Sequence, residues 1–356
     1  MTRFSTTGFV FLLLLAAACS RDQALITLDL PGGTRLTFQE GQRAALALTQ
    51  DKTEGYFANI TLTDMAIQLK KPVAEFPDRE QAMAEYLAAL EREVMSFTLD
   101  DINYLESVFR RVNRLIYRFS PEVLPSRIGL IKVRGNLLGG AAFFTRDGNI
   151  ILGRELLTPA AESQLVDALI MSVFHLYSRQ HADQRPQLYQ LVGYQSLPVR
   201  LADIAMPADF REKLLLQPDA QDRHYTTSVA GIEAPYLLPL HTTAFHHFTM
   251  ETTSGLHKTC SIYVLEQTDS GAFALQLAPD GSSTISFTDL RQVIRQADPA
   301  ERTTFIHPEF ALAWLFNLAV RGEEESTEAA AELTDMQEET FQELHAVLEQ
   351  MASADG

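Results

Sequence analysis

Cysteine is scarce in this chain, which has 356 residues and only two cysteines, Cys19 and Cys260. If lipid is attached to Cys19, no second thiol remains to form an intramolecular disulfide with Cys260. The residues around Cys260 are typical of a strand, which favours a buried and inert thiol. A cysteine nucleophile would need a base beside it, and His257 is near in sequence.

Positive charge is also scarce, because 29 Lys and Arg residues stand against 46 Asp and Glu residues, for a net charge of −17. Residues 321–356 contain 11 acidic residues and one arginine and so supply −10 of that charge. This distribution argues against nucleic acid as a partner and against a basic membrane-surface patch. For the acidic tail the alternatives are a solvated helix and a docking segment for a basic partner.

Several catalytic motifs are missing as well. The chain contains no Gly-x-Ser-x-Gly elbow and no phosphate-binding glycine loop. Four histidines fall within 17 residues, but adjacent histidines on a strand point to opposite faces. A metal site there would therefore need one of them and a distant ligand. The four are His241, His246, His247 and His257.

The N-terminus has the features of an export signal. Arg3 precedes an apolar stretch, residues 9–18, which is too short to span a bilayer. Three alanines lead directly into Cys19, which resembles a bacterial lipobox and implies cleavage before Cys19 and lipid on its sulfur. The alternative is an ordinary signal peptide that is cut near Ala18. No later stretch is long and apolar enough to cross a membrane.

The resemblance to a lipoprotein signal implies a location in the bacterial cell envelope. An Asp after the lipidated cysteine would resemble an inner-membrane retention signal, whereas this chain has Ser20. We therefore expect an outer-membrane lipoprotein that faces the periplasm and is anchored through Cys19 without spanning the membrane.

The first third of the chain predicts strands followed by two helices. Residues 25–38 read as a hairpin around a Pro-Gly-Gly turn, and a third strand is expected within 56–70, giving a small N-terminal sheet. Helices are expected over 78–95 and 98–118, the second opening with Thr98 and an acid three residues later.

The rest of the chain alternates strands and helices. Strands are expected at 128–133, 141–145 and 149–152, and several more within 224–287. Helices are expected from 158 to 179, with Thr158-Pro159 as N-cap and first residue, and at 185–193, 289–296 and 308–320, with a partly amphipathic helix in the tail.

Five short segments together resemble a group of secreted bacterial zincin-like proteins. They correspond to a strand pair before the zinc helix, the end of that helix, a short following helix, an Asn-Pro-Asp-Ala-like loop and the start of a late helix. The segments are Phe144-Thr145-Arg146 with 149–151, 174–179, 188–194, 217–220 and 306–309.

The resemblance implies a zinc site that this chain has lost. In the family, a His-Glu-x-x-His helix supplies two ligands and the general base, and a glutamate on a later helix is the third ligand. Here that motif reads Met171-Ser172-Val173-Phe174-His175, so only His175 remains. The later Glu-Glu pair reads Glu309-Phe310, and a later Asp reads Trp314.

The resemblance also implies the fold and its divisions. We expect an α+β protein with a zincin-like core of mixed sheet and active-site-type helices, preceded by a small N-terminal β-sheet and a helical pair. The expected divisions are a signal peptide (1–18), a β-rich region (19–75), a helical pair (76–125), a degenerate zincin-like domain (126–322) and an acidic helix or tail (323–356).

The function predicted is therefore binding rather than hydrolysis. We expect a catalytically inactive, metallopeptidase-like envelope lipoprotein that binds a peptide or protein, or scaffolds other proteins, without a cofactor. The cleft residues expected are Phe144, Thr145, Arg146, Tyr177, Phe310 and Trp314.

Two alternatives remain open. A zinc peptidase with a rebuilt site would use His175, Glu309 and a later histidine, with the imidazole and the carboxylate about 4 Å apart around the ion. A purely structural lipoprotein would instead have its cleft filled by Met171, Phe310 and Trp314 around His175. Outside a metal site, His175 would be a core histidine and Glu309 a first-turn acid of its helix.

Overall fold

The computed structural model describes most of the chain after residue 24. The described ranges are 25–52, 55–137, 143–220, 225–228, 232–234, 236–242, 260–285, 307–322 and 335–354. The expected helix at 289–296 and the histidines His246, His247 and His257 lie outside these ranges.

A six-stranded mixed sheet forms the N-terminal half of the fold, with β1-β2-β4-β6-β5 side by side and β3 paired to β4. β2, β4 and β6 are parallel, whereas β1, β3 and β5 run antiparallel to their neighbours. The strands are β1 (Ile26–Asp29), β2 (Arg35–Gln39), β3 (Val94–Met95), β4 (Arg127–Val133), β5 (Phe143–Arg146) and β6 (Asn149–Gly153).

The predicted hairpin is confirmed as β1 and β2, but it does not form a small sheet of its own. β2 pairs in parallel with β4, from Arg35 opposite Arg127 to Gln39 opposite Ile131, so the hairpin belongs to the large sheet. Its turn needs glycine, because Gly32 and Gly33 have φ of +88° and +95°.

The prediction of a third strand within 56–70 is wrong. The segment forms helices α3 (Tyr56–Asn59) and α4 (Leu62–Leu69). The side chain of Thr61 caps α4 by accepting a hydrogen bond from the backbone N–H of Asp64. The apolar residues at 62, 65, 66 and 69 follow helical spacing and share one face of α4. A helix can bury this face, whereas a strand would point these residues to both sides of a sheet.

The other helices largely follow the sequence predictions. Thr98 and Asp101 form the predicted capping box at the start of α6. Thr158 makes no side-chain cap, because a 3₁₀ turn (Pro159–Ala161) precedes α7. The predicted helices are α5 (Arg79–Glu93), α6 (Leu99–Phe119), α7 (Glu162–Gln180), α8 (Arg185–Gln190), α12 (Pro308–Gly322) and α13 (Asp335–Ala354). Helices α2 (Gly41–Thr49) and α9 (Ala208–Arg211) were not predicted.

A second, antiparallel sheet of five strands follows α8, in the order β11-β10-β9-β8-β7. Strands were predicted between 224 and 287, and β8 to β11 confirm this where the chain is described. The strands are β7 (Tyr194–Ser196), β8 (Tyr225–Thr227), β9 (Leu237–His241), β10 (Cys260–Gln267) and β11 (Phe273–Leu275).

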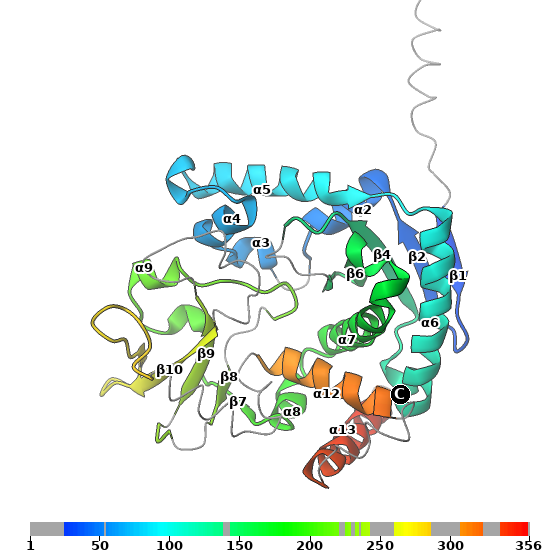
Figure 1. The fold of residues 1–356 in the computed structure, drawn as a ribbon. Helices are drawn as coiled ribbons and strands as arrows, with labels where there is room; N and C mark the ends of the chain where they lie inside the picture. The colour runs from blue at the N-terminus through cyan, green and yellow to red at the C-terminus, as the bar shows by residue number, and fades with distance from the viewer. Residues whose placement is uncertain are drawn as a thin grey trace, which may run out of the picture.

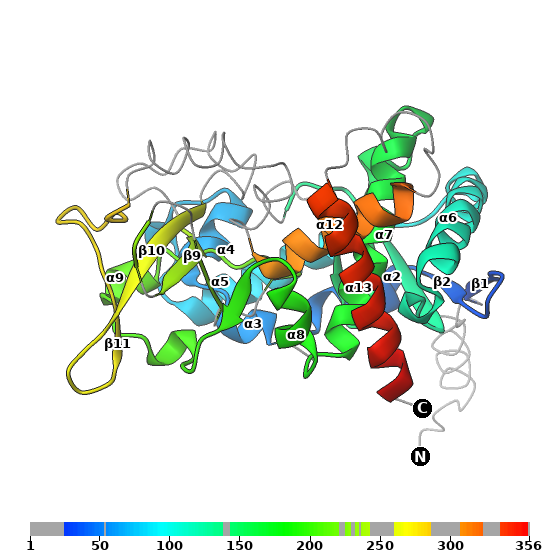
Figure 2. The same cartoon turned by 90° about the horizontal axis from the view of Figure 1, so that it is seen from below.

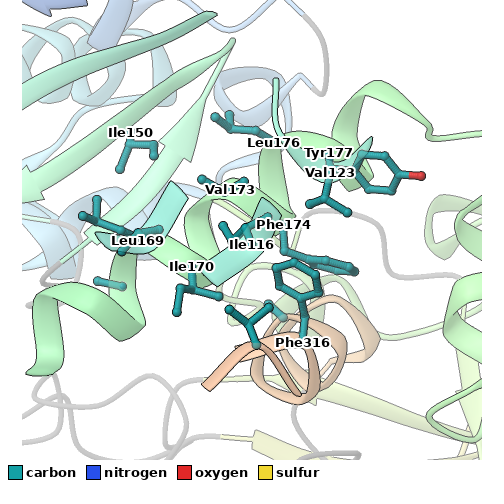
Figure 3. Close-up of a cluster of buried hydrophobic side chains, with 14 of the residues drawn as sticks. Ile116, Val123, Ile150, Leu169, Ile170, Val173, Phe174, Leu176, Tyr177 and Phe316 are labelled. Atoms are coloured by element: carbon teal, nitrogen blue, oxygen red, sulfur yellow. The ribbon is translucent and has the colours of Figure 1, made fainter. Parts of the chain in front are cut away.

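Helices α7 and α12 lie between the two sheets (Figures 1 and 2). α12 packs against α6, α7, α8 and α13, so it joins the N-terminal and C-terminal halves of the chain. Figure 3 shows the largest apolar cluster at this point, where Phe174 of α7 lies beside Phe316 of α12. The rings of Phe174 and Phe316 lie 5.1 Å apart between centroids.

The fold is thus α+β, as predicted, with a mixed sheet, an antiparallel sheet and ten helices in the described residues. Within the described ranges, we find no helix with the length and hydropathy required to cross a membrane.

Candidate functional site at the contact of helices α7 and α12

His175 and Glu309 meet where α7 crosses the first turn of α12. The Nδ1 atom of His175 lies 2.8 Å from Oε1 of Glu309. The two side chains are 1% and 2% exposed, so the pair is inside the core. This contact joins two residues that are 134 positions apart in the sequence. His175 lies in the fourth turn of α7, and Glu309 is the second residue of α12.

The other carboxylate oxygen of Glu309 has two donors. The hydroxyl of Ser178 donates to Oε2 at 2.7 Å, and the hydroxyl of Tyr189 donates to the same atom at 2.5 Å. The Nε of Arg185 lies 3.2 Å from the Ser178 hydroxyl oxygen. Three helices, α7, α8 and α12, therefore converge on one carboxylate.

This network sets the protonation of Glu309. Burial by itself raises the pKa of a carboxyl group, but the His175 hydrogen bond and charge, with Arg185 and Tyr189, outweigh it and lower the pKa of Glu309 to about 2. Burial and the adjacent Glu309 charge raise the pKa of Tyr189 well above 10. At neutral pH Glu309 is therefore ionised, Tyr189 remains a donor, and Nδ1 of His175 carries the shared proton.

The start of α12 completes the surroundings of the pair. The backbone N–H of Glu309 donates to Nδ1 of His307 at 3.1 Å, which satisfies one of the free amides at the helix N-terminus. Glu309 is also the predicted first-turn acid. The Phe310 ring stands edge-to-face on the His175 ring, with centroids 5.5 Å apart.

Met171 and Ser172 are the residues that the sequence resemblance would align with the first histidine and the glutamate of a zinc motif. Met171 is half-buried and packs against the largest apolar cluster, and Ser172 is completely buried. Within the described part of the chain, the hydroxyl of Ser172 and the Nε2 atom of His175 are both buried without a hydrogen-bond partner.

The pair lacks the spacing of two ligands around one zinc ion. A shared ion at about 2 Å from each ligand separates the donor atoms by more than 3 Å, whereas these atoms are in direct hydrogen-bond contact. Among the described residues, no group of three or more His, Cys, Asp or Glu side chains could hold a metal ion. His175 and Glu309 were the metal-ligand candidates of the sequence analysis, and here they bond each other.

The predicted cleft residues of β5 are part of the core. Phe144 is 2% exposed and packs in a second apolar cluster. The guanidinium of Arg146 lies 4.6 Å from the rings of both Tyr56 and Phe57, a stacked cation–π contact. Thr145 and Arg146 are almost fully buried.

The outer edge of β5 is covered at Thr145. The backbone N–H of Thr145 donates to Oδ1 of Asp219 at 2.9 Å, and the Thr145 hydroxyl bonds the same oxygen. Arg179 of α7 donates to the Thr145 hydroxyl at 2.5 Å and forms an ion pair with Asp219. An extended peptide could pair with this part of the edge only by displacing Asp219.

The remaining predicted cleft residues are not gathered in one place. Tyr177 is buried, and its hydroxyl lies 3.9 Å from the sulfur of Met351 in α13. Trp314 is half-buried, one helical turn after Phe310. Of the six expected residues, Phe310 contacts His175 directly.

Four residues of the site were not predicted to contribute to it: Ser178, Arg185, Tyr189 and Asp219. A signal for Ser178 was present, because it follows His175 by three positions and so shares its helix face. The other three depend on contacts between distant segments, which spacing along the chain cannot show.

Comparisons of the chain with protein-family models, with curated proteins and with solved structures found no match.

Proposed function

We propose that this chain is a lipid-anchored envelope protein whose metallopeptidase-like domain is catalytically inactive and serves to bind or scaffold another protein. The anchor is the lipid on Cys19 that the N-terminal sequence implies. Degeneration of the zinc motif at Met171 and Ser172 supports the inactive state, because neither residue can replace a zinc-binding imidazole or a general base.

One observation carries this proposal: the His175–Glu309 pair is a closed structural contact. Glu309 accepts hydrogen bonds from His175, Ser178 and Tyr189, so its oxygens are already occupied. A catalytic zinc site keeps an open position for water and substrate. A carboxylate buried to this extent is suited instead to holding α7, α8 and α12 together.

The binding surface proposed is outside the former cleft. Because Asp219 covers β5 at Thr145, strand addition is unfavourable there. The C-terminal helix α13 buries Leu344, Leu348 and Met351 in the core and leaves the acidic side chains of Glu343 and Glu349 exposed. An acidic exposed face of this kind favours a basic protein segment as the partner.

A purely structural role is the second candidate, and the edge-to-face contact of Phe310 on His175 favours it. That contact fills space beside the imidazole with an apolar ring. The two candidates differ in whether the α13 face binds a partner. Reversing the exposed charges Glu343 and Glu349 to Lys would reduce partner binding in the first case and change nothing in the second.

The proposal is tested by metal content and peptidase activity. The chain from Ser20 onward, which contains every described element, would be purified and its zinc measured by mass spectrometry, with cleavage of a mixed peptide library as the activity assay. We expect less than one tenth of an equivalent of zinc and no cleavage that a chelator inhibits. Stoichiometric zinc with chelator-sensitive cleavage would contradict the proposal.

A further inference from the structure

One nitrogen of the His175 ring is engaged and the other is not. Nδ1 bonds Glu309, whereas Nε2 is buried and has no hydrogen-bond partner among the residues that the structure describes. Buried polar atoms in folded proteins are almost always paired, and an ordered water or a bound ion usually accounts for the exceptions. Because Nδ1 is bonded to Glu309, Nε2 is the ring nitrogen that is left to bind a ligand.

A carboxylate behind an imidazole is also the usual setting of a metal-binding histidine. Such histidines nearly always donate their second ring N–H to a carboxylate, a backbone carbonyl or water, which fixes the ring and raises the basicity of the ligand nitrogen. Glu309 has this relation to His175, and Ser178 and Tyr189 hold the carboxylate in place. Nε2 is therefore oriented as a ligand.

A second donor atom lies on the same face of α7. Met171 precedes His175 by four residues, a spacing that places Cβ atoms about 5–6 Å apart. The same spacing allows two histidines of one helix to bind a single ion. Met171 is half-buried, so this position of α7 is open to the surface in part.

We infer that Met171 and His175 form a binding site for a soft monovalent cation, namely Cu(I). Thioether and imidazole donors suit Cu(I), which is stable with two ligands, and do not suit zinc, which needs a harder set of three or four. Glu309 remains behind His175 and is not a ligand. This inference deepens the proposed function, on which it rests, by assigning a cation to the helix that lost the zinc motif.

The test uses Ag(I), a redox-inert substitute for Cu(I), on the chain from Ser20 onward with Cys260→Ser, which removes a competing thiol. Binding would be followed by titration calorimetry and by the ¹³C-methyl resonances of labelled methionines. We expect one strongly bound Ag(I) and a shift of the Met171 resonance. Glu309→Gln should lower the affinity about 10–100-fold, as other changes behind a metal-binding histidine do.

Met171→Leu is the decisive variant, because it keeps the side-chain volume and should leave the fold intact. It should abolish the strong site, whereas Met65→Leu, a buried methionine in another cluster, should leave it unchanged. Undiminished Ag(I) binding by Met171→Leu, or no binding by the parent chain, would overturn the inference and leave the proposed function standing. Stoichiometric zinc with peptide cleavage would overturn the proposed function itself.

Discussion

The imidazole of His175 donates from Nδ1 to the carboxylate of Glu309 across 2.8 Å, although 134 residues separate them in the sequence. The contact joins α7, which packs beneath the mixed sheet, to α12, which begins after the second sheet. Because each side chain is at most 2% exposed, neither water nor salt screens the pair. We therefore expect the His175–Glu309 hydrogen bond to contribute to the free energy of unfolding of the whole fold.

Removing the imidazole should destabilise the protein strongly. His175→Ala leaves the Glu309 carboxylate buried and without its charged or polar partner, and the loss of one member of such a pair costs about 3–5 kcal/mol of unfolding free energy. Urea unfolding at pH 7 would measure the cost. Arg110→Ala breaks the exposed Glu106–Arg110 pair and serves as control, with an expected loss below about 1 kcal/mol. If His175→Ala and Arg110→Ala lost the same unfolding free energy, the buried pair would contribute no more to stability than the exposed pair.

Stability should decline in acid through Glu309. Its folded-state pKa of about 2 lies below the ordinary value of 4.5, so the stabilisation is fully present above pH 4.5 and is lost as the pH falls towards 2. The shift corresponds to roughly 3 kcal/mol. Glu309→Gln lacks the titrating group, so the difference in unfolding free energy between parent and variant should shrink over this range. A difference that stays constant from pH 5 to pH 2 would contradict the lowered pKa.

The hydroxyl of Tyr189 should contribute more than an ordinary surface hydroxyl. Tyr189→Phe keeps the ring and deletes the donor to Glu309, and a hydrogen bond to a charged group is worth about 1.5–3 kcal/mol. Tyr104→Phe is the matched control, because its hydroxyl donates to the backbone carbonyl of Thr158 at an exposed position. Thermal and urea unfolding should rank Tyr189→Phe as clearly more destabilised. The opposite order would mean that Tyr189 does not hold Glu309 in solution.

Asp219 should protect the edge of the mixed sheet. Asp219→Ala removes the acceptor for the backbone N–H of Thr145 and the partner of Arg179. We expect faster hydrogen exchange of the Thr145 amide and a loss of about 1–3 kcal/mol. Asp203→Ala, at an exposed pair with Arg200, should change neither quantity measurably. Unchanged exchange of Thr145 in Asp219→Ala would show that the edge is open in solution.

The predictions from sequence succeeded where a local signal was specific. The Pro31-Gly32-Gly33 turn and the Thr98 capping box each depend on a few neighbouring residues, and both were located correctly. The segment 56–70 failed because its apolar residues fit both spacings in part. The Thr61 cap, a helix signal, was overlooked.

The candidate site was predictable only in part. His175 and Glu309 were identified as residual motif positions, but their direct contact depends on the packing of α12 against α7, which no local pattern encodes. The same limit applies to Asp219 at Thr145. Pairing between β2 and β4, across five intervening α-helices and one strand, is also a property of the folded chain rather than of either strand.

The most direct test of the central claim is the thermal unfolding of the parent chain with a strong chelator, with added zinc and with neither. If His175 and Glu309 form a structural contact that needs no zinc, the midpoint temperature should be the same in all three conditions within about 1 °C, since a ligand that binds only the folded state raises stability by mass action. A midpoint that falls by several degrees with chelator, or rises by several degrees with zinc, would contradict the account.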